Sequence, residues 1–371
     1  MSYRRKSKLQ NNAQNFILKL RDEVMSVVDA PTEKRRLAAL HTEVEHHHGP
    51  MEAELNSDEA VVLCVVKDGE SLVGAFVKHY LALGFKHLFF LDNGSTDRTI
   101  KILSAYNQTT VVSSAKPFGE YYVTFKNFLI QAFGQGKWCL VADIDEFLHF
   151  PLNQRLSDVL AYLNRYNYSA VCVQMLDMFS KKGIALSKHQ AIWTLEHLRS
   201  TFCYYDLSGI DRKKYVRRLQ SRVHSGLNFL YGGIRKTAFN RDCFLTKEVL
   251  FRVSGGTCLK SSHLLHRSRI ADFSAVFLHY KFIEDFYAAA VEAVAQENHW
   301  RKSHEYKAYL TVLAQATSAE SEGDREKESV FSLFQPSSLL LKEIDDLIDH
   351  NFLFVSDEFR TFCSSACGSR R

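Results

Sequence analysis

Short apolar runs alternate with helix-like stretches over about 90 residues of this sequence. Buried strands are expected at 60–66, 86–91, 110–112 and 138–142, and helices at 72–83, 99–106 and 125–133 between them. Strands that alternate with helices in this way pair in parallel, through helical crossovers that are almost always right-handed. The sequence therefore predicts an α/β fold with a mostly parallel, mixed sheet and helices on both of its faces.

Three carboxylates stand within four residues at the end of the last run: Asp143, Asp145 and Glu146. If the extended geometry continues past Ala142, Asp143 and Asp145 point to the same side and repel each other unless a cation lies between them. Oxygen ligands of this kind suit Mg²⁺ or Mn²⁺. A capped strand end followed by a helix is the alternative, with Asp145 or Glu146 near the helix N-terminus.

Polar loops follow three of the predicted parallel strands. They are Lys67-Asp68-Gly69-Glu70, Asp92-Asn93 and Asp143-Ile144-Asp145. Ligands of open α/β sheets bind beyond the carboxyl ends of the strands. The three loops are therefore expected to meet at one edge of the sheet and to form a binding site there.

Composition and charge narrow the class of protein. The 371 residues are 46% hydrophobic and 24% charged, which is ordinary for a globular protein. A net charge of +5 does not require nucleic acid, and it would also suit a polyanionic ligand or an anionic membrane surface. The eight cysteines include no Cys-x-x-Cys pair, and neither a signal peptide nor an apolar run of about 20 residues is present. A reduced, cytoplasmic protein is expected.

The flanking regions and the second half of the chain are less regular. Amphipathic helices are expected at 16–28 and 340–348, a short helix at 33–45, a polar loop at 46–48, and a disordered tail at 363–371. The basic run 211–218 is either a solvated face or a contact for a polyanion. Paired glycines at 232–233 precede Arg235 and Lys236, which indicates a close approach of the backbone to a ligand. A strand at 276–282 places His279 and Lys281 on one face.

Taken in order, these motifs resemble a GT-A glycosyltransferase of the family 2-like branch, close to glycosyltransferase family 92. The residues that carry the resemblance are the strand at 60–66 with Lys67-Asp68-Gly69-Glu70, His79-Tyr80-Leu81-Ala82-Leu83-Gly84-Phe85, Leu91-Asp92-Asn93-Gly94-Ser95-Thr96-Asp97-Arg98-Thr99, Asp143-Ile144-Asp145-Glu146-Phe147-Leu148, Tyr231-Gly232-Gly233-Ile234-Arg235-Lys236 and Leu278-His279-Tyr280-Lys281-Phe282. The resemblance covers about residues 60–285. It divides the chain into a helical N-terminal extension (1–57), a GT-A domain (58–285) and a helical C-terminal extension with a tail (286–371).

The resemblance implies a set of metal and donor residues. Asp145 would bind Mn²⁺ or Mg²⁺ directly, Asp143 would face the ribose or a metal-bound water, and His279 would be a later metal ligand. The remaining expected donor contacts are Lys67, Glu70, Asp92, Asn93, Arg235, Lys236 and Lys281. The branch usually carries Lys-Asn-Glu after the first strand, so the insertion in Lys67-Asp68-Gly69-Glu70 is a departure from the pattern.

The expected function is a metal-dependent, inverting transfer of sugar from a nucleotide-sugar, most simply a UDP-sugar, to a glycan or lipid-linked acceptor, as in polysaccharide biosynthesis. An inverting reaction needs a carboxylate to accept the proton of the acceptor hydroxyl, and Asp177 is the candidate base, with Glu284 and Asp285 as rivals. A non-catalytic nucleotide- or glycan-binding module of the same fold is the alternative. A nucleotidyltransferase would more naturally carry a Gly-rich phosphate loop. No nucleic-acid partner is expected, and the basic N-terminal helix leaves peripheral membrane contact open.

Overall fold

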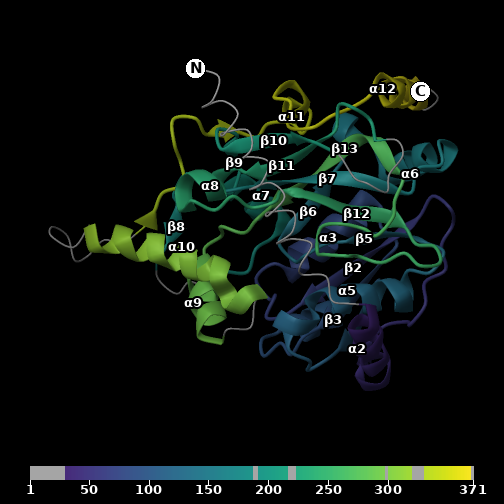
Figure 1. Ribbon diagram of the computed structural model, residues 1–371, viewed down its shortest axis with the longest axis horizontal. Coiled ribbons are helices and arrows are strands. Elements are labelled where there is room, and N and C mark those ends of the chain that lie inside the picture. The colour runs from purple at the N-terminus through teal and green to yellow at the C-terminus, as the bar shows by residue number, and fades with distance from the viewer. Residues whose placement is uncertain (1–29, 187–190, 216–222, 297–299, 320–329, 369–371) are drawn as a thin grey trace, which may run out of the picture.

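A computed structural model describes residues 30–186, 191–215, 223–296, 300–319 and 330–368 (Figure 1). Within these ranges a nine-stranded sheet forms the centre of the molecule. In spatial order its strands are β1 (Glu45–His48), β4 (Thr109–Ser113), β3 (His87–Asp92), β2 (Ala60–Val66), β5 (Trp138–Val141), β12 (Thr246–Arg252), β7 (Ala170–Asp177), β13 (Ile270–His279) and β6 (Glu146–His149).

Helices and short ribbons surround the sheet. The helices are α2 (Ala30–Glu43), α3 (Val73–Leu83), α4 (Thr99–Leu103), α5 (Phe118–Phe133), η1 (Pro151–Asn153), α6 (Leu156–Arg165), α7 (Leu195–Thr201), α8 (Ile234–Phe239), α9 (Phe286–Gln296), α10 (Trp300–Ala319), α11 (Asp346–Asp349) and α12 (Asp357–Gly368). The ribbons pair β10 (Ile210–Lys214) with β11 (Asn228–Gly232), β14 (Val330–Phe331) with β8 (Ile184–Ala185), and β15 (Leu339–Leu340) with β9 (Tyr204–Tyr205). None of the helices within the described ranges is long and apolar enough to cross a membrane.

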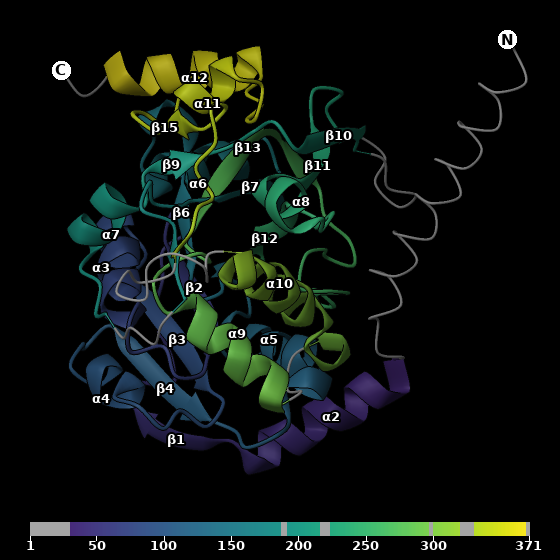
Figure 2. The ribbon, with the colours of Figure 1, turned by 90° about the vertical axis from the view of Figure 1, so that its left-hand side faces the viewer.

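The first half of the sheet is parallel, as predicted. Strands β4, β3, β2 and β5 pair in parallel, with β3 and β5 on opposite sides of β2. Right-handed crossovers then place α3 and α4 on one face and α5 on the other. Figure 2 shows α3 and α7 on one side of the sheet and α5 with α10 on the other. The strand order reverses between β2 and β5, which makes this the point where a ligand is expected.

The second half of the sheet is mixed and curled. Strand β12 runs antiparallel between β5 and β7, and β13 pairs in parallel with β7 and antiparallel with β6. Only residues 142–145 join β5 to β6, although three strands separate them in the sheet. A flat sheet would hold them about 19 Å apart, whereas the linking turn covers at most about 14 Å. The sheet must therefore curl, and the curl gathers the ends of β12, β7 and β13 around this turn.

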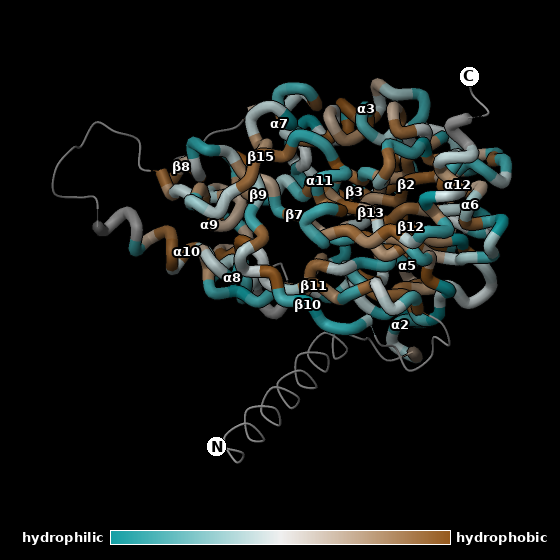
Figure 3. The backbone as a smooth tube through the Cα atoms, turned by 90° about the horizontal axis from the view of Figure 1, so that it is seen from above, coloured by the Kyte–Doolittle hydropathy of each residue, from teal (hydrophilic) through white to brown (hydrophobic). Residues whose placement is uncertain are grey.

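The core explains why the central strands read as continuous apolar runs. All seven residues of β2 are buried, because helices cover both faces of the sheet. Figure 3 shows the apolar stretches concentrated along the central strands and the polar stretches at the periphery. From α5, Phe133 stacks on Phe89 of β3 with ring centroids 4.3 Å apart. Gly84 ends α3 as expected, with φ 104° and its N–H bonded to Leu81 O at 3.1 Å.

Several local predictions are wrong. Residues 340–348 do not form one helix, because the backbone at β15 pairs with β9 and leaves only the short α11. Part of the tail expected to be disordered belongs to α12, where Phe359 stacks on Phe273 with centroids 3.9 Å apart. Residues 46–48 lie in strand β1, which pairs with β4. The helix expected at 16–28 lies outside the described residues.

Candidate functional site

The acidic stretch forms a turn that passes the ends of three strands. Glu146 N–H donates to Asp143 O at 3.0 Å, which closes the turn between β5 and β6. Strand β5 ends at Val141, so the extended geometry assumed from the sequence does not continue through the two aspartates. Asp143 instead faces β12, whereas Asp145 faces β13. The two carboxylates therefore have different partners and different roles.

Two buried lysines balance the charge of Asp143. Lys126 Nζ of α5 lies 2.6 Å from Asp143 Oδ1, and Lys247 Nζ of β12 lies 3.0 Å from Oδ2. Lys247 also pairs with Glu146, whose side chain is 1% exposed and accepts from Asp143 N–H at 3.0 Å. Although burial favours the neutral acid, Lys126 and Lys247 hold the pKa of Asp143 well below its usual range. Despite the burial of Lys247, the two carboxylates raise the pKa of its ammonium.

Asp145 begins a row of buried groups through His279 to Asp177. His279 Nε2 lies 3.1 Å from Asp145 Oδ2, and His279 Nδ1 lies 2.5 Å from Asp177 Oδ1. Strand pairing fixes this row, because His279 stands opposite Asp177 in the β13–β7 ladder. Burial opposes a charged imidazole, but Asp145 and Asp177 outweigh it and raise the pKa of His279 to about 9. Burial likewise opposes ionised Asp145, but His279 outweighs it and lowers its pKa to about 2.

Beyond Asp177, the row continues through Arg235 to Glu305, and Lys281 lies nearby. Arg235 of α8 donates from Nε to Asp177 Oδ2 at 2.8 Å and from Nη2 to Asp177 Oδ1 at 2.7 Å. Against the effect of burial, Arg235 and His279 hold the pKa of Asp177 well below its usual range. Arg235 Nη1 also lies 3.6 Å from Glu305 of α10. Lys281 Nζ lies 4.8 Å from the ring centroid of Tyr306, also on α10.

Glu305, Lys126 and Lys247 were missed by sequence reasoning. Lys126 lies on the buried face of α5, and Lys247 lies in a strand that is buried except at Arg252. A charged residue inside a run that must be buried requires a partner, and this was the available signal. Glu305 carried no such signal, because the first eight residues of α10 include several other charged side chains.

The residues expected to contact the nucleoside are engaged in shaping their own loops. Glu70 pairs with Arg98, whose N–H donates to Glu70 Oε2 at 2.9 Å. Asp92 Oδ1 accepts from Gly94 N–H at 3.0 Å and Ser95 N–H at 2.9 Å.

Two cations and the amide of Asn93 complete the set of expected donor residues. Asn93 Nδ2 donates to Ser114 O at 2.7 Å, which ties its loop to the end of β4. Lys67 is exposed at the end of β2. Lys236 pairs with Asp211 at 2.6 Å on the surface. It therefore does not share the buried partners of its neighbour Arg235.

The paired glycines serve the backbone itself. Gly233 N–H donates to Gly209 O at 3.1 Å, and a Cβ at Gly232 would lie 2.4 Å from the same oxygen. Gly233, with φ 65° and ψ −152°, occupies a region essentially reserved for glycine. The close approach predicted here is therefore made to Gly209, and it directs α8 and Arg235 toward Asp177.

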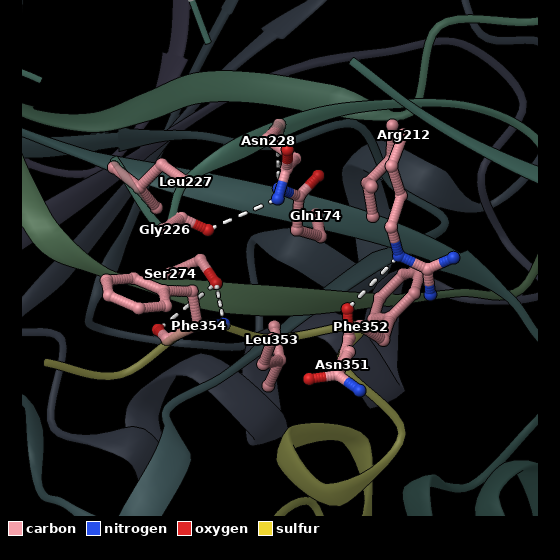
Figure 4. Close-up of a pocket in the computed structure, with 11 residues that line it drawn as sticks. Gln174, Arg212, Gly226, Leu227, Asn228, Ser274, Asn351, Phe352, Leu353 and Phe354 are labelled. Atoms are coloured by element: carbon pink, nitrogen blue, oxygen red, sulfur yellow. Dashed lines mark hydrogen bonds between the residues drawn. The ribbon is translucent and has the colours of Figure 1, made fainter. Parts of the chain in front are cut away.

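A small pocket of about 110 Å³ lies elsewhere, between β7, β13 and residues 351–354 (Figure 4). Its polar groups are largely paired with one another. Gln174 Nε2 donates to Asn228 O at 3.0 Å, and Arg212 Nε donates to Asn351 O at 3.3 Å. None of the acidic-turn residues lines it, so we place the chemistry at the carboxyl edge of the sheet.

Asp145 and His279 fit a divalent cation as a pair. Two ligands at right angles around Mg²⁺, each about 2.1 Å from the ion, are about 3 Å apart. The 3.1 Å between Asp145 Oδ2 and His279 Nε2 matches that spacing. The described residues contain no group of three or more His, Cys, Asp or Glu side chains that could hold a metal. A metal here would therefore take its other ligands from phosphate and water, as Mg²⁺ commonly does.

The α/β sheet with an acidic turn at the carboxyl edge of its switch point agrees with the expected GT-A glycosyltransferase fold. The chain belongs to glycosyltransferase family 92, whose model matches residues 61–309, more than half of its length. The match extends past residue 285 and includes Glu305 and Tyr306. No curated protein matches the chain.

Two similar solved structures are both glucosyl-3-phosphoglycerate synthase from Mycobacterium tuberculosis. One is a complex with Mn²⁺, UDP and glucosyl-3-phosphoglycerate, at 18% identity over 32% of this chain and 44% of that chain, with a TM-score of 0.23. The other is a complex with Mn²⁺, UDP and phosphoglyceric acid, at 16% identity over 39% of this chain and 47% of that chain, with the same TM-score of 0.23. The matches span less than half of those chains, and at this TM-score they carry no argument about the site.

Proposed function

We propose that this glycosyltransferase is metal-dependent and inverting, and that it transfers a sugar from a nucleoside diphosphate sugar of the UDP class to a glycan or lipid-linked acceptor. The observation that carries the proposal is the 3.1 Å pair of Asp145 Oδ2 and His279 Nε2 at the switch-point edge of the sheet. It combines the spacing of two ligands of one ion with the place where α/β sheets bind nucleotides.

Each group in the site has a role in this reaction. Asp145 and His279 would hold Mn²⁺ or Mg²⁺, which when bound acts as a Lewis acid on the leaving diphosphate. Lys67 and Lys281 add fixed positive charge toward the phosphates. The rings of Tyr306 and Tyr309 hold the Lys281 ammonium, whose Nζ lies 4.8 Å and 5.8 Å from their centroids. Asp143, tied to Lys126 and Lys247, keeps the turn in the shape that presents Asp145.

The environment of Asp177 does not favour the role of general base that was predicted for it. Its side chain is 3% exposed, and both of its oxygens accept bonds from Arg235. Of the two rivals, Asp285 has the better environment. Its Oδ1 is buried without a hydrogen-bond partner among the described residues, and burial raises its pKa. A base with a pKa nearer the working pH accepts a proton more effectively. We therefore assign proton acceptance to Asp285.

The metal and donor assignment is tested by thermal unfolding with UDP, GDP or CDP, each with Mn²⁺ or EDTA. We expect a Mn²⁺-dependent rise in Tm with UDP, because a ligand at about 100 times its Kd adds roughly 2.7 kcal/mol to the folded state. Asp145→Asn should abolish the rise, whereas the exposed control Asp357→Asn should keep it. No rise with any nucleotide, or a rise that survives in Asp145→Asn, would refute the assignment.

Turnover separates the enzyme from the alternative non-catalytic module. Release of UDP from a UDP-sugar should occur in the wild-type protein and fall by about 100-fold or more in Asp285→Asn. The Mn²⁺-dependent Tm rise with UDP should persist in that variant. Nucleotide binding without turnover in the wild-type protein would support the binding module. Wild-type turnover in Asp285→Asn would rule out Asp285 as the base.

A further inference from the structure

The ring of His279 has two competing neighbours at Nδ1. Asp177 Oδ1 lies 2.5 Å from this nitrogen, and Arg235 Nη2 lies 2.9 Å from it. The carboxylate can only accept a hydrogen bond from Nδ1–H, whereas the guanidinium can only donate one to an unprotonated Nδ1. The two neighbours therefore favour opposite tautomers of the neutral imidazole. Whichever of them dominates decides whether the lone pair of Nε2 is available on the side of Asp145.

The arrangement gives Asp177 the advantage. Arg235 donates two parallel bonds to Asp177, at 2.8 Å and 2.7 Å, so one of the two Nη2 hydrogens is already used, and Asp177 Oδ1 is the nearer neighbour of His279 Nδ1, at 2.5 Å. Asp177 remains as the acceptor for Nδ1–H. A cation at Nε2 would take the place of the proton there, and the bond from Nδ1–H to Asp177 would then hold the ring with Nε2 toward Asp145 Oδ2. A metal-ligating histidine commonly donates its other N–H to a carboxylate in the same way.

Arg235 is itself held in place by a second carboxylate, that of Glu305. Arg235 is 6% exposed, and Glu305 lies 3.6 Å from its Nη1, on the side away from Asp177. Arg235 is thus held between two carboxylates that belong to β7 and α10. Strand β13, strand β7, helix α8 and helix α10 each supply one member of the row, and residues 177–305 are needed to complete it. The geometry of His279 therefore depends on elements that do not touch the metal position.

We propose that Asp177 and Arg235 are positioning residues that fix the tautomer and orientation of His279, so that Nε2 and Asp145 together form the cation site. This inference rests on the proposed function, because it assumes that the cation binds between Asp145 and His279. It gives Asp177 a task that needs no contact with the acceptor. Glu305 acts one step further out, by orienting Arg235.

The test is the Mn²⁺ affinity of the full chain with UDP present, measured from the electron paramagnetic resonance signal of unbound Mn²⁺ against a control of UDP alone. Removal of such a supporting carboxylate commonly weakens metal affinity by about 10- to 100-fold. We expect a loss of that size in Asp177→Asn. Asp272→Asn is the matched control. Like Asp177, Asp272 is a buried carboxylate in the central sheet, but it lies on β13 at a different place, where its Oδ1 accepts from Tyr162 OH at 2.8 Å. It should bind Mn²⁺ with wild-type affinity.

A second variant covers the case in which Asp177→Asn does not fold. Arg235→Lys keeps the positive charge but cannot donate two parallel bonds to one carboxylate, so we expect Mn²⁺ affinity about 10-fold weaker. A folded variant of either kind with wild-type Mn²⁺ affinity would overturn the inference. In selectively ¹⁵N-labelled protein, the Nδ1–H of His279 should exchange slowly with water in the wild type and faster in Asp177→Asn, because the neutral amide is a weaker acceptor than the carboxylate.

The outcomes also separate this inference from the proposed function. If the wild type binds Mn²⁺, Asp145→Asn abolishes binding and Asp177→Asn leaves it unchanged, the metal site stands and the positioning role fails. If Asp145→Asn binds Mn²⁺ as well as the wild type, or if the wild type binds none, the metal site itself fails and the inference fails with it.

Discussion

Replacing Lys247 with methionine removes the positive charge that pairs with the Glu146 carboxylate, and this carboxylate is too buried for water to solvate it instead. Glu146 is 1% exposed and has Lys247 as its ion-pair partner. Asp143 is less affected, because its side chain is 37% exposed and it keeps Lys126 at 2.6 Å. Removing one partner of a buried pair destabilises by about 3–5 kcal/mol, whereas an exposed pair contributes about 0–1 kcal/mol. We therefore expect Lys247→Met to lower the free energy of unfolding by about 3–5 kcal/mol, nearly all of it from Glu146.

Urea unfolding at pH 7.5 measures this loss, and a second substitution identifies its source. Glu146→Gln in the Lys247→Met background removes the unpaired charge and can still accept the Asp143 N–H bond, now 3.0 Å long. We expect the double variant to recover about 2 kcal/mol or more. Lys86→Met is the control, since Lys86 pairs with Glu59 at 3.1 Å but is 57% exposed, and it should lose about 1 kcal/mol or less. A loss below about 1 kcal/mol in Lys247→Met, or simple additivity in the double variant, would refute the reasoning.

Two further predictions concern buried polar groups away from the metal position. Burial lowers the pKa of His79 to about 3 and that of His87 to about 4. Below the unfolded pKa of about 6.5, folded molecules therefore bind fewer protons than unfolded ones. The contribution of each histidine to the free energy of unfolding is fully present above that pH. It decreases below it by up to about 1.4 kcal/mol per pH unit. Urea unfolding should give a lower free energy of unfolding at pH 5.0 than at pH 6.0, and a smaller difference between the two pH values in His79→Gln. Equal stability of the wild type at both pH values would contradict this prediction. Tyr80 OH donates to Glu146 O at 2.7 Å and accepts from Leu148 N–H at 3.2 Å. Tyr80→Phe strands both buried groups, so we expect unfolding to become about 1–3 kcal/mol easier, and a change below about 0.5 kcal/mol would disprove the role of the hydroxyl.

The parallel half of the sheet could be predicted because its signals are local. Strand β2 is apolar throughout, Gly84 ends α3, and the loops after β2, β3 and β5 follow from the alternation of strands and helices. Periodicity and turn chemistry are properties of neighbouring residues, so one sequence suffices to detect them. The same reasoning placed Asp145 after a strand and His279 inside a strand expected at 276–282, and the structure brings the two side chains within 3.1 Å at the end of β13.

The partners of these residues could not be predicted, because they depend on which strands become neighbours. The insertion of β12 between β5 and β7 brings Lys247 to Asp143, and no local pattern encodes that order. The helix expected at 340–348 failed for a related reason, since pairing of β15 with β9 overrides the helical periodicity. Asp177 was recognised as a site residue by its place after a strand, but its tie to Arg235 comes from a helix 58 residues away.

The position of β12 also sets the order in which the site can be assembled during synthesis. The parallel strands are complete once residue 141 has been made, but Lys247 follows Asp143 by 104 residues. At ribosomal rates of about 5–20 residues per second, the acidic turn waits on the order of 5–20 seconds for this counter-charge. His279 and Glu305 arrive later still. The nascent chain therefore passes through a stage with a formed parallel sheet and an unbalanced cluster of carboxylates at its edge, and a cation available at that stage would stabilise the turn before the protein's own lysine reaches it.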